Sequence, residues 1–135
     1  MERSRWETWW SRNWVDEVIE ELPLFVFGTL RRGEANHHYL NGRYERCLKA
    51  RLYGFCRQKP LMIVRRAGES VAGEVFFLRP AVYQETLKNC DRLEGIPEGK
   101  TEGWEYRRMK VQVETDLGTV TAWAYVHPAT SSHAV

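Results

Sequence analysis

Residues 23–33 read Pro-Leu-Phe-Val-Phe-Gly-Thr-Leu-Arg-Arg-Gly, an apolar run that ends in a basic, glycine-bounded loop. Four consecutive apolar residues, Leu24–Phe27, are typical of a short strand that is buried on both faces. Gly28 allows the backbone to turn sharply and a ligand to approach it closely. Successive free N–H groups in such a turn form a site for an anion, either a carboxylate or a developing oxyanion. An ordinary strand-ending turn would give the same pattern.

Strand-like alternation continues through most of the chain. Apolar and polar residues alternate over 48–53, and further strands are predicted over 61–64 and 71–78. Residues 109–114 and 120–126 also alternate around a turn, which indicates a hairpin. A flat sheet of so many short strands would leave exposed edges. We therefore predict an α+β fold, a small mixed β-barrel of five to six strands with flanking helices.

Two helices are predicted beside the strands. The first covers residues 2–22, where tryptophans at positions 6, 10 and 14 recur every fourth residue before Pro23. The second covers residues 81–93 and is followed by the stop signal Gly95. Residues 34–44 are predicted to be a polar helix or turn. The chain is thus divided into a tryptophan-rich helix (1–23), a single domain (24–128) and a frayed tail (129–135).

The apolar stripe of the first predicted helix indicates that it docks on the domain or on a second copy of the chain, which would give a homodimer. A helix lying on a membrane surface is the alternative, but acidic residues in its second half disfavour anionic lipid. No apolar run approaches the roughly 20 residues that a membrane span requires. The acidic residues also argue against a signal peptide, so a cytoplasmic protein is expected.

Composition excludes several functional classes. The 135 residues are 43% hydrophobic with a formal net charge of +2, which suits one packed domain and indicates no nucleic-acid partner. Three basic pairs, Arg31-Arg32, Arg65-Arg66 and Arg107-Arg108, leave single-stranded nucleic acid as a weak alternative. The three cysteines have no disulfide-like spacing, and no zinc motif occurs, so we expect no metal site.

Two carboxylates stand three residues apart at the end of the second predicted helix, in Cys90-Asp91-Arg92-Leu93-Glu94-Gly95. The helix dipole and partial burial should raise the pKa of Glu94, and such a carboxyl can shuttle protons near neutral pH. Tyr106 could donate a hydrogen bond to a buried carboxylate, and Arg107 or Arg108 could pair with it. Tyr125 could line a pocket or fill the core. The alternative for the carboxylates is a solvated surface pair.

The order of these segments is more specific than any one of them. Residues 27–33, Gly73-Glu74-Val75, residues 91–95, 106–108 and 122–126 together resemble the γ-glutamylcyclotransferase and γ-glutamylamine cyclotransferase superfamily, which includes AIG2-like proteins. The resemblance extends from residue 24 to residue 127. It implies a small mixed barrel and release of 5-oxoproline from a γ-glutamyl amine, amino acid or peptide, without cofactor or metal.

The resemblance also implies roles for individual residues. Glu94 matches the catalytic acid/base of that family. Substrate-binding positions match Phe27, Gly28, Thr29, Leu30, Tyr106 and Tyr125. The family loop usually begins with tyrosine, so Phe27 lacks any hydroxyl contact made from that position. A non-catalytic protein that binds a metabolite or a partner on the same fold is the alternative.

Overall fold

The computed structural model describes residues 21–130. The helix predicted over 2–22 lies outside the described residues except for its last two positions, and the homodimer through it stays a prediction. The described elements, in chain order, are β1 (Leu24–Val26), the 3-10 helix η1 (His37–Tyr39), β2 (Tyr44–Lys59), β3 (Met62–Leu78), the 3-10 helix η2 (Pro80–Val82), α2 (Tyr83–Leu93), β4 (Arg107–Thr115) and β5 (Gly118–Val126).

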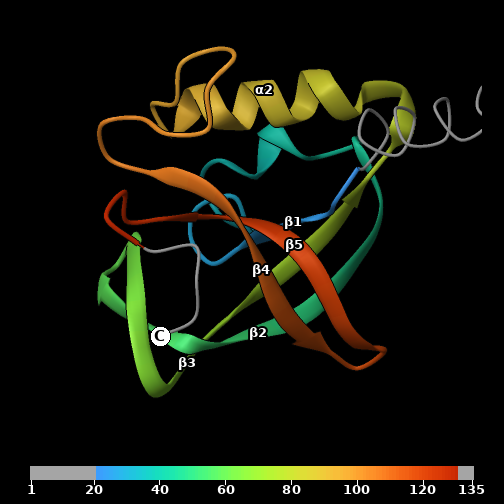
Figure 1. The fold of residues 1–135 in the computed structure, drawn as a ribbon. Coiled ribbons are helices and arrows are strands. Elements are labelled where there is room, and N and C mark those ends of the chain that lie inside the picture. Colours follow the sequence, from blue (N-terminus) through green and yellow to red (C-terminus); the bar gives the residue numbers. More distant parts are fainter. Residues whose placement is uncertain (1–20, 131–135) are drawn as a thin grey trace, which may run out of the picture.

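The strands form a closed barrel in the order β1-β3-β2-β4-β5 (Figure 1). Neighbouring strands are antiparallel, except that β1 closes the barrel by pairing parallel to β5. Closure gives every strand two neighbours, and the need to limit exposed sheet edges is the physical reason for expecting a barrel in so short a chain. The predicted α+β fold with a small mixed barrel is confirmed.

β1 separates two hydrophobic clusters. Phe25 and Phe27 lie in the cluster inside the barrel, whereas Leu24 and Val26 lie in the cluster beneath α2. This alternation follows from the two-residue period of a strand. All four side chains are buried, so the prediction of a strand covered on both faces is confirmed. The loop after β1 consequently begins between the barrel and the helix.

Two predicted strands are one in the structure. The separate strands predicted over 61–64 and 71–78 form the single strand β3, and β2 begins at Tyr44 rather than at residue 48. Tyr53 pairs with Ser70 but Phe55 pairs with Arg65, so residues 66–69 bulge out of the ladder. A bulge bends a strand and strengthens its twist without ending it. In the sequence, its polar residues and glycine look like a turn.

Gly73 permits the close approach of β3 to β1. A Cβ atom there would lie 2.3 Å from the carbonyl oxygen of Val26 and 2.8 Å from the ring of Phe25. We therefore expect Gly73→Ala to lower the free energy of unfolding by about 1–3 kcal/mol, as measured by urea denaturation. Gly28→Ala is the matched control, because its Cβ would meet the flexible end of Leu61 at 3.0 Å. Equal stability of the two variants would contradict this reading.

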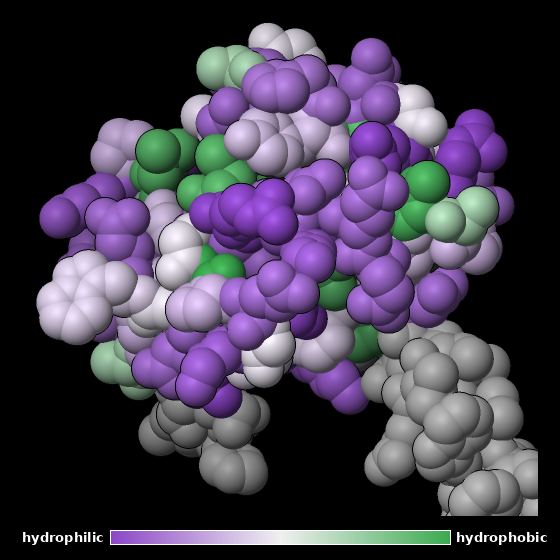
Figure 2. Space-filling model, turned by 90° about the horizontal axis from the view of Figure 1, so that it is seen from above, coloured by the Kyte–Doolittle hydropathy of each residue, from purple (hydrophilic) through white to green (hydrophobic). Residues whose placement is uncertain are grey.

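α2 covers one side of the barrel, and the surface seen from that side is mainly hydrophilic (Figures 1 and 2). The helix begins two residues later than predicted, because Pro80–Val82 form a 3-10 turn. Residues 34–44 contain turns and the short helix η1, as one of the two alternatives predicted. Within residues 21–130, no helix combines the length and apolarity needed to cross a membrane. Thr130, in the predicted tail, is buried and accepts a hydrogen bond from Arg107.

Candidate active site

The end of α2 determines where Glu94 points. Glu94 is the C-cap residue, and Gly95 follows it with a φ of 80°, in the left-handed region. The N–H of Gly95 donates to the carbonyl of Arg92 at 3.0 Å, and the N–H of Ile96 donates to that of Asp91 at 2.9 Å. These two bonds make a Schellman motif, and the buried Ile96 anchors it in the cluster beneath the helix. The sequence Glu-Gly-Ile-Pro thus fixes the position of Glu94.

The segment after α2 packs directly against this helix end, as the orange loop in Figure 1 shows. A Cβ atom on Gly103 would lie 2.3 Å from the carbonyl oxygen of Gly95. The N–H of Gly103 donates to the carbonyl of Tyr106 at 2.8 Å, and the N–H of Arg108 donates to that of Thr101 at 2.8 Å. The glycine-rich stretch is therefore anchored beside Glu94.

The loop after β1 is folded by hydrogen bonds that use its carbonyl groups. The N–H of Arg31 donates to the carbonyl of Gly28 at 3.1 Å, and that of Asn36 donates to the carbonyl of Thr29 at 2.9 Å. The side-chain amide of Asn36 also donates to the Thr29 hydroxyl at 2.9 Å. No described residue accepts a hydrogen bond from the backbone N–H of Gly28, Thr29 or Leu30. These donors are available to an anion.

Arg57 holds the start of the same loop. Its guanidinium donates to the carbonyl of Phe27 at 2.6 Å and lies 5.2 Å from the centre of the Phe27 ring. It also donates to the carbonyl of Pro60 at 2.6 Å, which joins the loop to the β2–β3 turn. Burial lowers the pKa of Arg57, with a smaller effect of the charge on Arg31 in the same direction. Arg57 therefore supports the loop through two backbone carbonyls.

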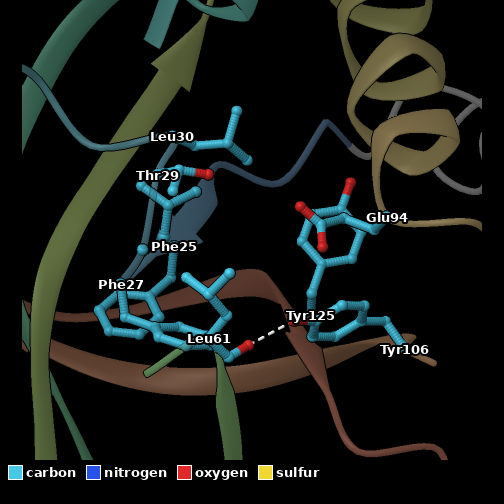
Figure 3. Close-up of a pocket in the computed structure, with 10 residues that line it drawn as sticks. Phe25, Phe27, Thr29, Leu30, Leu61, Glu94, Tyr106 and Tyr125 are labelled. Carbon is cyan, nitrogen blue, oxygen red and sulfur yellow. Dashed lines mark hydrogen bonds between the residues drawn. The ribbon is translucent and has the colours of Figure 1, made fainter. Parts of the chain in front are cut away.

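One pocket brings all the predicted site residues together. Its empty volume, with the open mouth included, is about 380 Å³. The lining residues are Phe27, Gly28, Thr29, Leu30, Glu94, Tyr106 and Tyr125, together with Phe25, Val26 and Leu61. Figure 3 shows Glu94, at the end of the helix, across the pocket from Thr29 and Leu30. A proton-accepting group and the residues whose backbone N–H groups have no described acceptor thus line one space.

The environment of Glu94 favours its protonated form. Burial is the largest cause that raises the pKa of Glu94 to about 7, followed by the negative charges of Glu105 and Asp91. Among residues 21–130, no side chain donates a hydrogen bond to its carboxylate or forms an ion pair with it. A carboxyl group with this pKa is partly ionised at neutral pH, so it can both accept and return a proton.

Asp91 lies in a separate buried network behind the pocket wall. The Nε of Arg108 lies 2.9 Å and 3.2 Å from its two carboxylate oxygens, and the Tyr125 hydroxyl donates to it at 2.6 Å. The Arg108 guanidinium also lies 4.4 Å from the ring centre of Trp123. Burial raises the pKa of Tyr125 well above its ordinary value, with smaller contributions from Cys90 and Asp91. The network holds Tyr125 in its place beside the pocket.

The tyrosine in this network differs from the one predicted. Tyr106 was the expected donor to a buried carboxylate, but its hydroxyl donates to the backbone carbonyl of Leu61 (Figure 3). Burial raises the pKa of Tyr106, and the charges of Glu94 and Glu105 raise it further. Tyr125, on β5, makes the carboxylate contact instead, through its hydrogen bond to Asp91.

Sequence reasoning missed three lining residues, Phe25, Val26 and Leu61. Phe25 and Val26 were assigned to the core, and they also line the pocket because β1 leads directly into the loop after it. Leu61 was assigned to a strand, but it lies in the β2–β3 turn and its side chain is 47% exposed. An exposed leucine after Pro60 was the available signal, although only the folded hairpin shows where it reaches.

The chain is similar to a known protein family and to named proteins of other organisms. The chain matches the family model described as "Gamma-glutamyl cyclotransferase, AIG2-like" over residues 24–134. It is 37% identical over 112 residues to a Vibrio cholerae protein provisionally named a γ-glutamylcyclotransferase, with 79% of this chain and 83% of the relative covered. It is 35% identical over 109 residues to the γ-L-glutamyl-butirosin B γ-glutamyl cyclotransferase of Niallia circulans, with 77% and 65% covered.

Among solved structures, the chain resembles YkqA from Bacillus subtilis with a TM-score of 0.62 and 28% sequence identity. The match covers 81% of this chain and 36% of YkqA, so the chain spans about a third of the length of that protein. The family match, the relatives and the closed mixed barrel agree with one another. This chain therefore belongs to the AIG2-like γ-glutamyl cyclotransferase family.

Proposed function

We propose that this protein is a γ-glutamyl cyclotransferase that releases 5-oxoproline from a γ-glutamyl amine, amino acid or peptide. One observation carries the proposal: Glu94, with its raised pKa, shares a pocket with the unpaired N–H groups of Gly28, Thr29 and Leu30. Membership of the family and the name of the Niallia circulans relative support the same chemistry.

The proposed reaction is an intramolecular acyl transfer. The α-amine of the substrate attacks its own γ-carbonyl carbon, which forms the C–N bond of a five-membered ring. The original γ-amide C–N bond then breaks, and the amine leaves. Because nucleophile and carbonyl belong to one molecule, much of the entropic cost is already met, which for well-oriented ring closures amounts to about 7–11 kcal/mol.

Glu94 and the loop after β1 divide the remaining tasks. The carboxylate of Glu94 accepts the proton that the α-amine loses, and the resulting acid returns it to the leaving nitrogen, so the protons balance with one carboxyl group. The N–H groups of residues 28–30 stabilise the negative charge that develops on the γ-carbonyl oxygen. Loss of one such donor typically costs about 2.7–4 kcal/mol of transition-state stabilisation.

A direct assay tests the proposed activity. The purified protein is incubated with γ-glutamyl amino acids, a γ-glutamyl-lysine isopeptide and γ-glutamyl alkylamides, and 5-oxoproline is measured by mass spectrometry. We expect release from at least one of these compounds. A non-catalytic binding protein would retain a γ-glutamyl compound without forming 5-oxoproline, and that result would reject the proposal.

The pKa of Glu94 predicts how activity depends on pH. Since only ionised Glu94 can accept the proton, kcat/KM should rise with pH around a midpoint near 7, the pKa that burial and neighbouring charges produce. Glu105→Gln removes the largest charge effect on Glu94, so the midpoint should move to lower pH. Glu114→Gln is the control, because Glu114 is exposed on β4 and its carboxylate accepts a hydrogen bond from the Thr119 hydroxyl. Coincident profiles for Glu105→Gln and wild type would contradict this assignment.

A further inference from the structure

A second, larger groove opens beside the candidate active site. Its walls come from the β2–β3 turn, from residues 102–106 and from the chain after β5. Leu61 and Tyr106 line both spaces, and the hydrogen bond between them marks the boundary (Figure 3). With open mouths included, the groove has about 1550 Å³ of empty volume and the inner pocket about 380 Å³. A substrate with its glutamyl part in the pocket can extend its leaving group into the groove.

One wall of the groove is acidic and aromatic. Glu102 and Glu105 line it on either side of Trp104, whose side chain is 94% exposed. Neither glutamate forms an ion pair with another described residue. Lys59, at the end of β2, is the single lysine or arginine in the described lining, so acidic groups predominate. This wall is complementary to a cation.

The acidic wall lies close to the reacting groups. Gly103 packs closely against Gly95: a Cβ atom at Gly103 would lie 2.3 Å from the Gly95 carbonyl oxygen. The segment with the acidic wall therefore lies directly against the turn that follows Glu94. The negative charge of Glu105 also raises the pKa of Glu94. A positive group a few bonds beyond the scissile nitrogen would therefore come within range of Glu105, and the groove continues from there to Glu102.

We infer that the groove binds the leaving-amine half of the substrate and selects an amine that carries a second, cationic nitrogen. This inference rests on the proposed function. The methylene groups of such a chain would pack on Leu61 and Tyr106, and its ammonium group would lie at the face of Trp104 between the two carboxylates. A neutral alkyl chain gains only the apolar contacts, and an acidic leaving group is repelled.

Two substrates of equal length isolate this charge. L-γ-Glutamyl-(4-aminobutyl)amide and L-γ-glutamyl-n-pentylamide differ only in an ammonium or a methyl group at the chain end. We expect kcat/KM to be at least about tenfold higher for the cationic amide at low ionic strength. The ratio should fall as salt is added, because exposed charges are screened. A ratio near one, or one that favours the pentylamide, overturns the inference.

Variants of the acidic wall locate the effect. Glu102→Gln and Trp104→Ala should each lower the ratio of the two kcat/KM values, and Glu102→Lys should lower it further. The control Glu114→Gln, on an exposed stretch of β4, should keep the wild-type ratio. If the ratio stays at its wild-type value in all three groove variants, the cation is bound elsewhere and the inference is wrong.

Unreactive analogues separate this inference from the proposed reaction. The matching glutaric acid monoamides lack the α-amine, so they can bind but cannot cyclise. Their affinities are measured by isothermal titration calorimetry. Suppose that no γ-glutamyl amide yields 5-oxoproline, but the cationic analogue binds about tenfold more tightly than the neutral one and loses this preference in Glu102→Gln. The proposed reaction would then be rejected, and the inference that the groove binds a cation would be supported. Equal affinities for the two analogues would overturn the inference that the groove selects a cation.

Discussion

Glu94→Gln should lower kcat for 5-oxoproline release by about 10²–10⁴-fold, the usual contribution of a general acid/base. Glutamine keeps the size and shape of the side chain but can neither accept nor return the proton. The N–H groups of residues 28–30 remain, so substrate binding should change much less than turnover. Activity near the wild-type level in this variant would remove Glu94 from the mechanism.

The same substitution should not destabilise the protein, and this distinguishes catalysis from folding. Glu94 has a folded-state pKa of about 7 against an ordinary value of 4.5, so the native state binds more protons across that interval. The stability of the wild type therefore falls as pH rises from 4.5 to about 7. At about pH 8, Glu94→Gln should be as stable as the wild type or more stable, by up to about 3 kcal/mol.

Denaturation with urea at two pH values checks this. At acid pH, where Glu94 is protonated in both folded and unfolded states, the two proteins should have similar unfolding free energies. At alkaline pH the variant should have a higher free energy of unfolding than the wild type. A variant that is inactive and also much less stable at alkaline pH would show that Glu94 holds the fold rather than the reaction.

Local sequence was sufficient to predict the two sides of the pocket. Leu24–Phe27 is apolar throughout because its side chains enter two different clusters. This run ends at the loop of residues 28–30, whose backbone N–H groups have no described acceptor. Gly95 ends α2 through a motif that needs a left-handed residue, which fixes Glu94 at the helix end. Both features arise within a few residues of the chain, so the pattern of residues contains them.

Contacts between distant elements could not be predicted in the same way. The partners of Asp91 are 17 and 34 residues away, and their choice depends on how β4 and β5 lie against α2. Leu61 reaches the pocket because β2 and β3 form one long hairpin with a bulge, whereas the sequence shows two apolar runs separated by polar residues. Strand register and hairpin length determine these positions, and neither can be predicted from the local alternation of apolar and polar residues.

Asp91→Asn should lower the free energy of unfolding by about 3–5 kcal/mol, because it leaves a buried charge without its partner. The side chains of Arg108 and Asp91 are 10% and 11% exposed, so water cannot replace the lost carboxylate. The Tyr125 hydroxyl would also lose the strong acceptor that it contacts at 2.6 Å. Urea denaturation at neutral pH measures the loss. In the exposed pair between Lys88 and Glu98, Glu98→Gln should cost far less.

A double-mutant cycle tests whether the cost comes from the unpaired charge. If it does, the double variant Asp91→Asn with Arg108→Met should recover much of the stability lost in Asp91→Asn, because no buried charge is left without a partner. Additive losses would mean that the two residues act independently, and this would contradict a stabilising contact between the Nε of Arg108 and the carboxylate of Asp91. Recovery of stability without recovery of KM would show that the carboxylate also positions Tyr125 for substrate, since methionine and asparagine can rebuild the packing but not the charge that orders the hydroxyl.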